Sequence, residues 1–122
     1  MGIWTIGMGK LIIYPSPDNR VISEYISFSK RTNPYENYDE YFENPWFFDD
    51  NNVLQSCAGK FDEPSMWLEY IKDFFGSKGY EVQGDPKIIS ECDEINFWEI
   101  CDIQNKQYLA WIKRKEVLER QI

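Results

Sequence analysis

Residues 64–80, PSMWLEYIKDFFGSKGY, decide the fold because they combine an apolar stripe with signals for both ends of a helix. A helix turns by about 100° per residue, so the large apolar side chains share one side: Trp67, Leu68, Ile71, Phe74 and Phe75. Pro64 suits a first turn, and Gly76 suits the position just past the end. Because three aromatic side chains on one stripe need a cover, the stretch predicts an amphipathic helix packed on a core.

A second amphipathic helix is predicted upstream. Ser16 is a suitable N-cap, Pro17 suits the first helical position, and Asn33-Pro34 must end the element. Its apolar side consists of Val21, Ile22, Tyr25, Ile26 and Phe28. Residues 3–14 precede it and are predicted to form a strand, in which Gly7 and Gly9 suggest a bulge or an edge twist.

The remaining elements are short strands and a last helix. Asp49-Asp50-Asn51-Asn52 is typical of a turn between two strands, the second covering residues 53–58. Further strands are predicted at 80–83, 87–92 and 97–101. Asp102 can then cap a C-terminal helix, with its apolar residues roughly on one side: Tyr108, Trp111, Ile112 and Leu118.

This order predicts an α+β fold in one domain, residues 1–122. A single antiparallel or mixed sheet, covered on one face by the two amphipathic helices, satisfies the pattern best. The arrangement is a two-layer sandwich of the split β-α-β kind, followed by a C-terminal helix. A right-handed crossover would place the first and central helices side by side.

Composition limits the partners that the chain can bind. Of its 122 residues, 21 are acidic and 13 basic, which gives a net charge of −8. Such a chain attracts basic proteins and repels nucleic acid and anionic membranes. We therefore expect no direct binding to nucleic acid or to membranes. No apolar run is long enough to span a bilayer. Three cysteines without CxxC spacing favour a cytoplasmic protein with reduced thiols.

The residue types that carry chemistry are scarce. The chain has no histidine, which removes the commonest general base, zinc ligand and partner of a nucleophile. Asp39-Glu40 and Asp62-Glu63 are formal candidates for paired-carboxylate catalysis, but solvated surface is the simpler interpretation. The turn at 49–52 lacks the glycine and glutamate of a calcium loop. We therefore expect no enzyme, no metal and no cofactor.

The most distinctive feature is an acidic-aromatic segment, residues 35–50. Between Thr32 and Gly59 there is no Lys or Arg, but there are six acids. We take nine residues of this segment as candidates for binding a partner: Tyr35, Glu36, Tyr38, Asp39, Glu40, Tyr41, Glu43, Asp49 and Asp50. One interpretation buries Trp46–Phe48 as a core strand. The other exposes an acidic surface to a basic partner, and both can hold at once.

The pattern W-L-x-Y-I-x-x-F-F-x-x-x-G-Y-x-x-x-G between Trp67 and Asp85 resembles small uncharacterised proteins of phages and mobile elements, which also begin with a strand like GKLIIYP at 9–15. The resemblance implies a protein acting in the bacterial host cytoplasm. It also implies kinship with anti-CRISPR and other anti-defence inhibitors, several of which mimic nucleic acid. In that case the acids of the segment would stand in the place of phosphates.

Three functions are open at this point. The first is an inhibitor that binds a nucleic-acid-handling defence protein such as a CRISPR nuclease. The second is an immunity protein that neutralises a basic toxin, and the third is a small-ligand binder with a pocket between sheet and helices. The basic residues within 106–120 could also pair with the acidic segment of a second copy, giving a homodimer.

Overall fold

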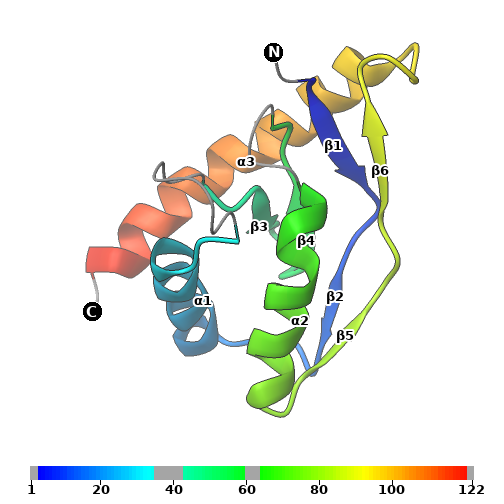
Figure 1. Cartoon of the computed structure of the whole chain (residues 1–122). Helices are drawn as coiled ribbons and strands as arrows, with labels where there is room; N and C mark the ends of the chain where they lie inside the picture. Colours follow the sequence, from blue (N-terminus) through cyan, green and yellow to red (C-terminus); the bar gives the residue numbers. More distant parts are fainter. Residues whose placement is uncertain (1–2, 35–42, 60–63, 121–122) are drawn as a thin grey trace.

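The computed structural model describes residues 3–34, 43–59 and 64–120. Within these ranges it is an α+β fold with six strands, one 3₁₀ turn and three helices, the last of them long (Figure 1). In chain order the elements are β1 (Thr5–Met8), β2 (Ile12–Tyr14), α1 (Asn19–Arg31), β3 (Trp46–Phe48), β4 (Leu54–Ser56), η1 (Pro64–Trp67), α2 (Leu68–Ser77), β5 (Glu81–Gln83), β6 (Lys87–Ser90) and α3 (Phe97–Arg120).

The predicted single sheet is replaced by three two-stranded antiparallel sheets: β1–β6, β2–β5 and β3–β4. The expected strand at 3–14 is interrupted because Gly9 has a φ of +103°, outside the range of a strand. The facing strand breaks at the same level, where Gly84 has a φ of +126°. The four outer strands therefore form one long, bent ribbon (Figure 1). An isolated bridge between Leu11 and Leu54 ties this ribbon to the hairpin.

The two amphipathic helices pack against each other, as the sequence predicts. Phe28 of α1 stacks on Phe74 of α2 with ring centroids 4.6 Å apart, and Tyr25 stacks on Phe75 at 5.5 Å. The predicted apolar side of α1 is buried throughout. Its start is different, because Asp18 rather than Ser16 is the N-cap and accepts a 3.0 Å hydrogen bond from the amide of Val21.

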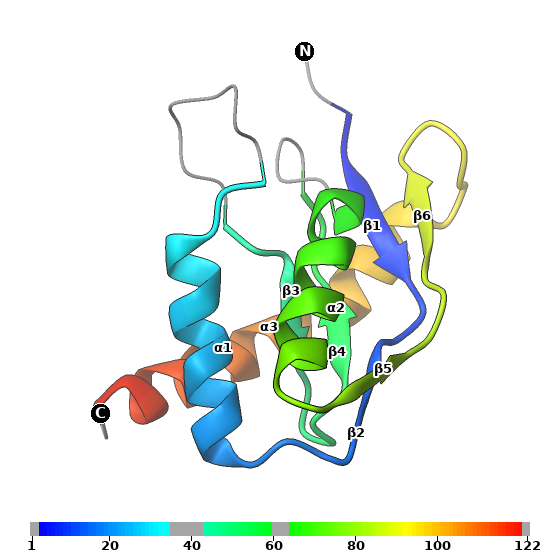
Figure 2. The same ribbon diagram turned by 60° about the horizontal axis from the view of Figure 1, so that its bottom comes forward.

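The hairpin β3–β4 lies between helices α2 and α3 (Figure 2). The ring of Phe48 packs against Phe75 of α2 and against Trp111 of α3, both with centroids 6.1 Å apart. The neighbouring residue, Phe47, packs edge-on against Tyr108 of α3 with ring centroids 5.4 Å apart. All three residues of β3 are buried, so their interpretation as a core strand is confirmed.

The C-terminal helix begins earlier than predicted. Residues 97–101 were expected to form a strand, but they are the first turns of α3, so Asp102 lies inside the helix and does not cap it. Short apolar runs are ambiguous between strand and helix. Here Phe97 and Cys101, four residues apart, are the two that are buried, and this is helical spacing.

Candidate functional site

The structure describes three of the nine candidate partner-binding residues: Glu43, Asp49 and Asp50. The other six lie outside the described residues: Tyr35, Glu36, Tyr38, Asp39, Glu40 and Tyr41. The structure therefore describes the last eight residues of the acidic-aromatic segment, 43–50.

Two of the three described acids are exposed, at opposite ends of β3. Glu43 precedes the strand and its carboxylate accepts a 3.3 Å hydrogen bond from the hydroxyl of Tyr108. Asp50 lies in the turn that follows the strand. Because Trp46–Phe48 between them are buried, the described acids do not form one continuous surface along the chain.

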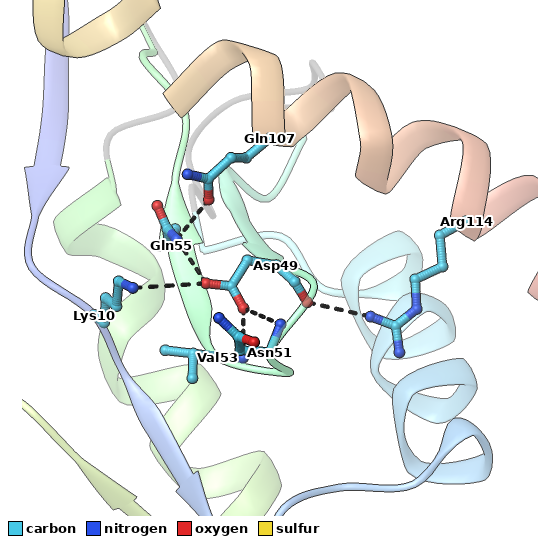
Figure 3. A network of polar contacts seen from close by, with 7 residues as sticks. All are labelled: Lys10, Asp49, Asn51, Val53, Gln55, Gln107 and Arg114. Atoms are coloured by element: carbon cyan, nitrogen blue, oxygen red, sulfur yellow. Dashed lines mark hydrogen bonds and ion pairs between the residues drawn. The ribbon is translucent and has the colours of Figure 1, made fainter. Parts of the chain in front are cut away.

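Asp49 is 7% exposed and its carboxylate is used inside the chain (Figure 3). Its Oδ1 accepts hydrogen bonds from the amides of Asn51 at 2.9 Å and Val53 at 3.1 Å, which close the hairpin turn. Its Oδ2 accepts a 2.6 Å hydrogen bond from Nε2 of Gln55, and Nζ of Lys10 lies 3.9 Å away. Asp49 therefore holds the hairpin together and does not present its charge to a partner.

The network around Asp49 continues into α3 (Figure 3). Gln55 donates a 2.6 Å hydrogen bond to Oε1 of Gln107, and Arg114 donates to the carbonyl of Asp49 at 3.4 Å and to Oδ1 of Asn52 at 2.8 Å. One turn of α3 before Gln107, Gln104 donates a 2.5 Å hydrogen bond to the carbonyl of Ser56. An aspartate at the start of an Asn-rich turn is typical of a turn that its side chain caps, so the role of Asp49 could be predicted from the sequence. No sequence pattern indicates that Gln107 and Arg114 of α3 join this network.

A cavity of about 350 Å³ lies between α1, α3 and the residues just before β3. Its walls include Tyr25, Ser29, Lys30, Glu43, Asn44 and Lys115. Asn44 donates hydrogen bonds to the hydroxyl of Tyr25 at 2.7 Å and to Oγ of Ser29 at 2.9 Å.

The tyrosine at the base of this cavity is in turn held by the core. Its hydroxyl donates a 2.9 Å hydrogen bond to the carbonyl of Trp46, and burial raises the pKa of Tyr25 well above its ordinary value. The phenol therefore stays neutral, and Tyr25 offers the cavity hydrogen bonds rather than a base.

The cysteines form no joint site in the described ranges. Cys57 is half-buried, Cys92 is exposed and Cys101 is buried, and no disulfide joins any of the three. Burial raises the pKa of the Cys101 thiol, which disfavours the reactive thiolate. Among residues 3–34, 43–59 and 64–120, no group of three or more His, Cys, Asp and Glu side chains could hold a metal ion.

The described helices also include none that is long and apolar enough to cross a membrane. Compared with known protein families, curated proteins and solved structures, the chain matches none of them.

Proposed function

We propose that the chain is a non-enzymatic inhibitor that binds a basic, nucleic-acid-handling defence protein, such as a CRISPR nuclease, through its acidic-aromatic segment. The observation that carries the proposal is the distribution of charge. Residues 32–59 contain six acids and no basic residue, so this stretch contributes −6 to a net charge of −8. A concentration of one sign of charge attracts a partner of the opposite sign from a distance and rejects like-charged ones.

The described residues narrow the surface that the proposal needs. Trp46–Phe48 and Asp49 belong to the fold, so we assign binding to the segment without them. Glu43 and Asp50 are exposed and take part in no ion pair with a described residue, so their charges remain available to a partner. The binding residues that we propose are Tyr35, Glu36, Tyr38, Asp39, Glu40, Tyr41 and Glu43, with Asp50 at the margin.

The mechanism is occupancy of a nucleic-acid groove. Carboxylates spaced along one surface can pair with the Lys and Arg side chains that otherwise hold phosphates. Tyrosines add contact area at little entropic cost and are enriched among the residues that dominate binding. The inhibitor then blocks its target by competing with DNA or RNA, and its own side chains carry out no chemical step.

A phage-plating assay tests this function. In a bacterium whose CRISPR immunity blocks a phage, expression of the protein should restore plating to the level seen without immunity. The triple variant Glu36→Lys, Asp39→Lys, Glu40→Lys should lose this protection because it reverses the charge of the proposed surface. A matched triple reversal at the exposed acids Glu69, Asp73 and Asp85 should keep it.

Protection that survives the first triple variant would contradict binding through this segment. Protection lost equally in both triple variants would show that only net charge matters. If the protein protects cells from a basic toxin instead of relieving immunity, the same surface serves an immunity protein, and the defence target is wrong.

The cavity between α1 and α3 favours a second candidate function, binding of a small neutral ligand. Its volume of about 350 Å³ falls at the low end of the range of ligand pockets. The side chains of Tyr25, Ser29 and Asn44 converge at its wall. A thermal-shift screen with small polar aromatics should raise the melting temperature of the wild type and not of Asn44→Leu, and equal shifts in both would exclude this pocket.

A further inference from the structure

The end of the molecule where β6 leads into α3 carries a second concentration of exposed apolar and acidic side chains. Figure 1 shows the N-terminal end of β1, the C-terminal end of β6 and the first turns of α3 at one corner. Ile95 is 99% exposed, Trp98 is 52% exposed and Ile3 is 49% exposed. Trp98 lies edge-on against the half-buried Trp4, with ring centroids 6.0 Å apart. We call Ile3, Trp4, Ile95 and Trp98 the corner patch.

This patch stands on an ordered base. Phe97 and Cys101 are buried with Ile6 in a small core of their own. The amide of Glu91 donates a 3.0 Å hydrogen bond to the carbonyl of Trp4, and the amide of Phe97 donates a 3.2 Å hydrogen bond to the carbonyl of Glu94. Because backbone contacts fix both sides of the loop, the corner patch is presented in a defined shape, which lowers the cost of binding.

The stretch of chain that contains Ile95 and Trp98 carries charge of one sign. Between Lys87 and Lys106 the chain has no basic residue and five acids: Glu91, Asp93, Glu94, Glu99 and Asp102. None of the five takes part in an ion pair with another described residue. The carboxylate of Glu91 accepts a 3.4 Å hydrogen bond from the amide of Trp4, and Asp102 lies one turn of α3 beyond Trp98.

We propose that the corner patch is a docking surface for a basic protein segment with an apolar face. Ile95 and Trp98 leave large apolar surfaces in contact with water, so they are suited to fill pockets on a partner. The surrounding carboxylates favour a partner that carries positive charge. A second copy of the chain is the less suitable occupant, because two molecules with a charge of −8 repel each other.

This surface is distinct from the acidic-aromatic segment and does not rest on the function proposed for it. The two are separable by mutation because they share no residue. Ile95 makes an ideal probe, since a side chain exposed to 99% contributes little to folding.

The test uses the full chain and a synthetic amphipathic helical peptide of Leu and Lys as the probe. Fluorescence anisotropy of the labelled peptide should report binding that weakens as salt is added. Ile95→Ser and Trp98→Ser should each weaken it at least ten-fold. Val117→Ser is the matched control, because Val117 is 51% exposed near the far end of α3, and it should stay within two-fold of the wild type.

Indole signals in a two-dimensional NMR spectrum locate the peptide independently of any variant. The signals of Trp4 and Trp98 should shift on titration, while those of the buried Trp46 and Trp67 should not. Wild-type affinity in both patch variants, or saturation without movement of the Trp4 and Trp98 signals, would overturn the proposal. Self-association that Ile95→Ser abolishes would overturn it in favour of a second copy as occupant.

Discussion

At the scale of single residues, the structure separates acids that serve the fold from acids that remain on the surface. Asp49 and Asp50 are neighbours in the sequence, yet the first is buried in hydrogen bonds and the second is exposed. Composition alone cannot make this distinction, because the difference lies in which carboxylate the turn directs toward Gln55 and Lys10. The acids of such a run are therefore only candidates for binding a partner until the geometry of the turn is known.

The first prediction compares these two neighbours. Asp49→Ala should lower the free energy of unfolding by about 1–3 kcal/mol, because it leaves the amides of Asn51 and Val53 without an acceptor and the side chain of Gln55 with Gln107 alone. Asp50→Ala should change it by less than about 0.5 kcal/mol. Urea unfolding of both variants measures the difference, and equal losses would show that Asp49 is not the residue that holds the turn.

A second residue-scale prediction concerns pH. The hydrogen bond from Lys78 to Glu24, 2.5 Å between Nζ and Oε2, lowers the pKa of that carboxyl from its ordinary value. A lowered folded-state pKa adds stability above the unfolded value, and this stability is lost as the pH falls through the folded value. Lys78→Met should therefore cost up to about 1 kcal/mol at neutral pH, since solvent screens this exposed pair.

Chemical denaturation of the wild type and of Lys78→Met at neutral pH and well below pH 4.5 checks this. The difference between the two proteins should shrink in acid. A difference that is the same at both pH values would assign the effect to the contact of Lys78 with the ring of Phe74, 5.1 Å from its centroid, rather than to the ion pair.

At the scale of elements, periodicity predicted the two amphipathic helices well. The apolar side of α1 is buried as expected, and on α2 Ile71, Phe74 and Phe75 are buried while Leu68 is half-buried. Strand pairing was predicted less well. The sequence marks where strands stop, but the division into three small sheets depends on Gly9 and Gly84 breaking facing strands at the same level. That coincidence involves residues 75 positions apart, which local patterns do not reveal.

Two glycine substitutions test this account of the ribbon. Gly84→Ala should destabilise the fold by more than about 2 kcal/mol, because the position has a positive φ and a Cβ there would collide with the carbonyl oxygen of Lys10. Gly76→Ala is the control: its Cβ would meet nothing within 4 Å, and alanine should stabilise α2 by about 0.5–1 kcal/mol. Thermal unfolding should move the two melting temperatures in opposite directions, and a neutral Gly84→Ala would refute the strained break.

At the scale of the whole molecule, the distribution of charge is easier to predict from the sequence than the fold. Helix α3 has an acid, Glu99, in its first turn and a basic residue, Arg120, in its last turn, and both positions suit the helix dipole. The acidic-aromatic segment was evident from the sequence, because composition alone defines it. The corner patch was not, since Ile95 and Trp98 are significant only once the loop after β6 is placed beside Trp4.

We propose that the acidic-aromatic segment occupies the nucleic-acid groove of a basic defence protein. Displacement of fluorescent target DNA from a purified, guide-loaded CRISPR nuclease tests it most directly. The wild type and the control variant Glu69→Lys, Asp73→Lys, Asp85→Lys should displace the DNA, while Glu36→Lys, Asp39→Lys, Glu40→Lys should not. Displacement that is equally strong in the latter variant, or a wild type that displaces DNA from no nuclease of a panel spanning the CRISPR types, would contradict the account.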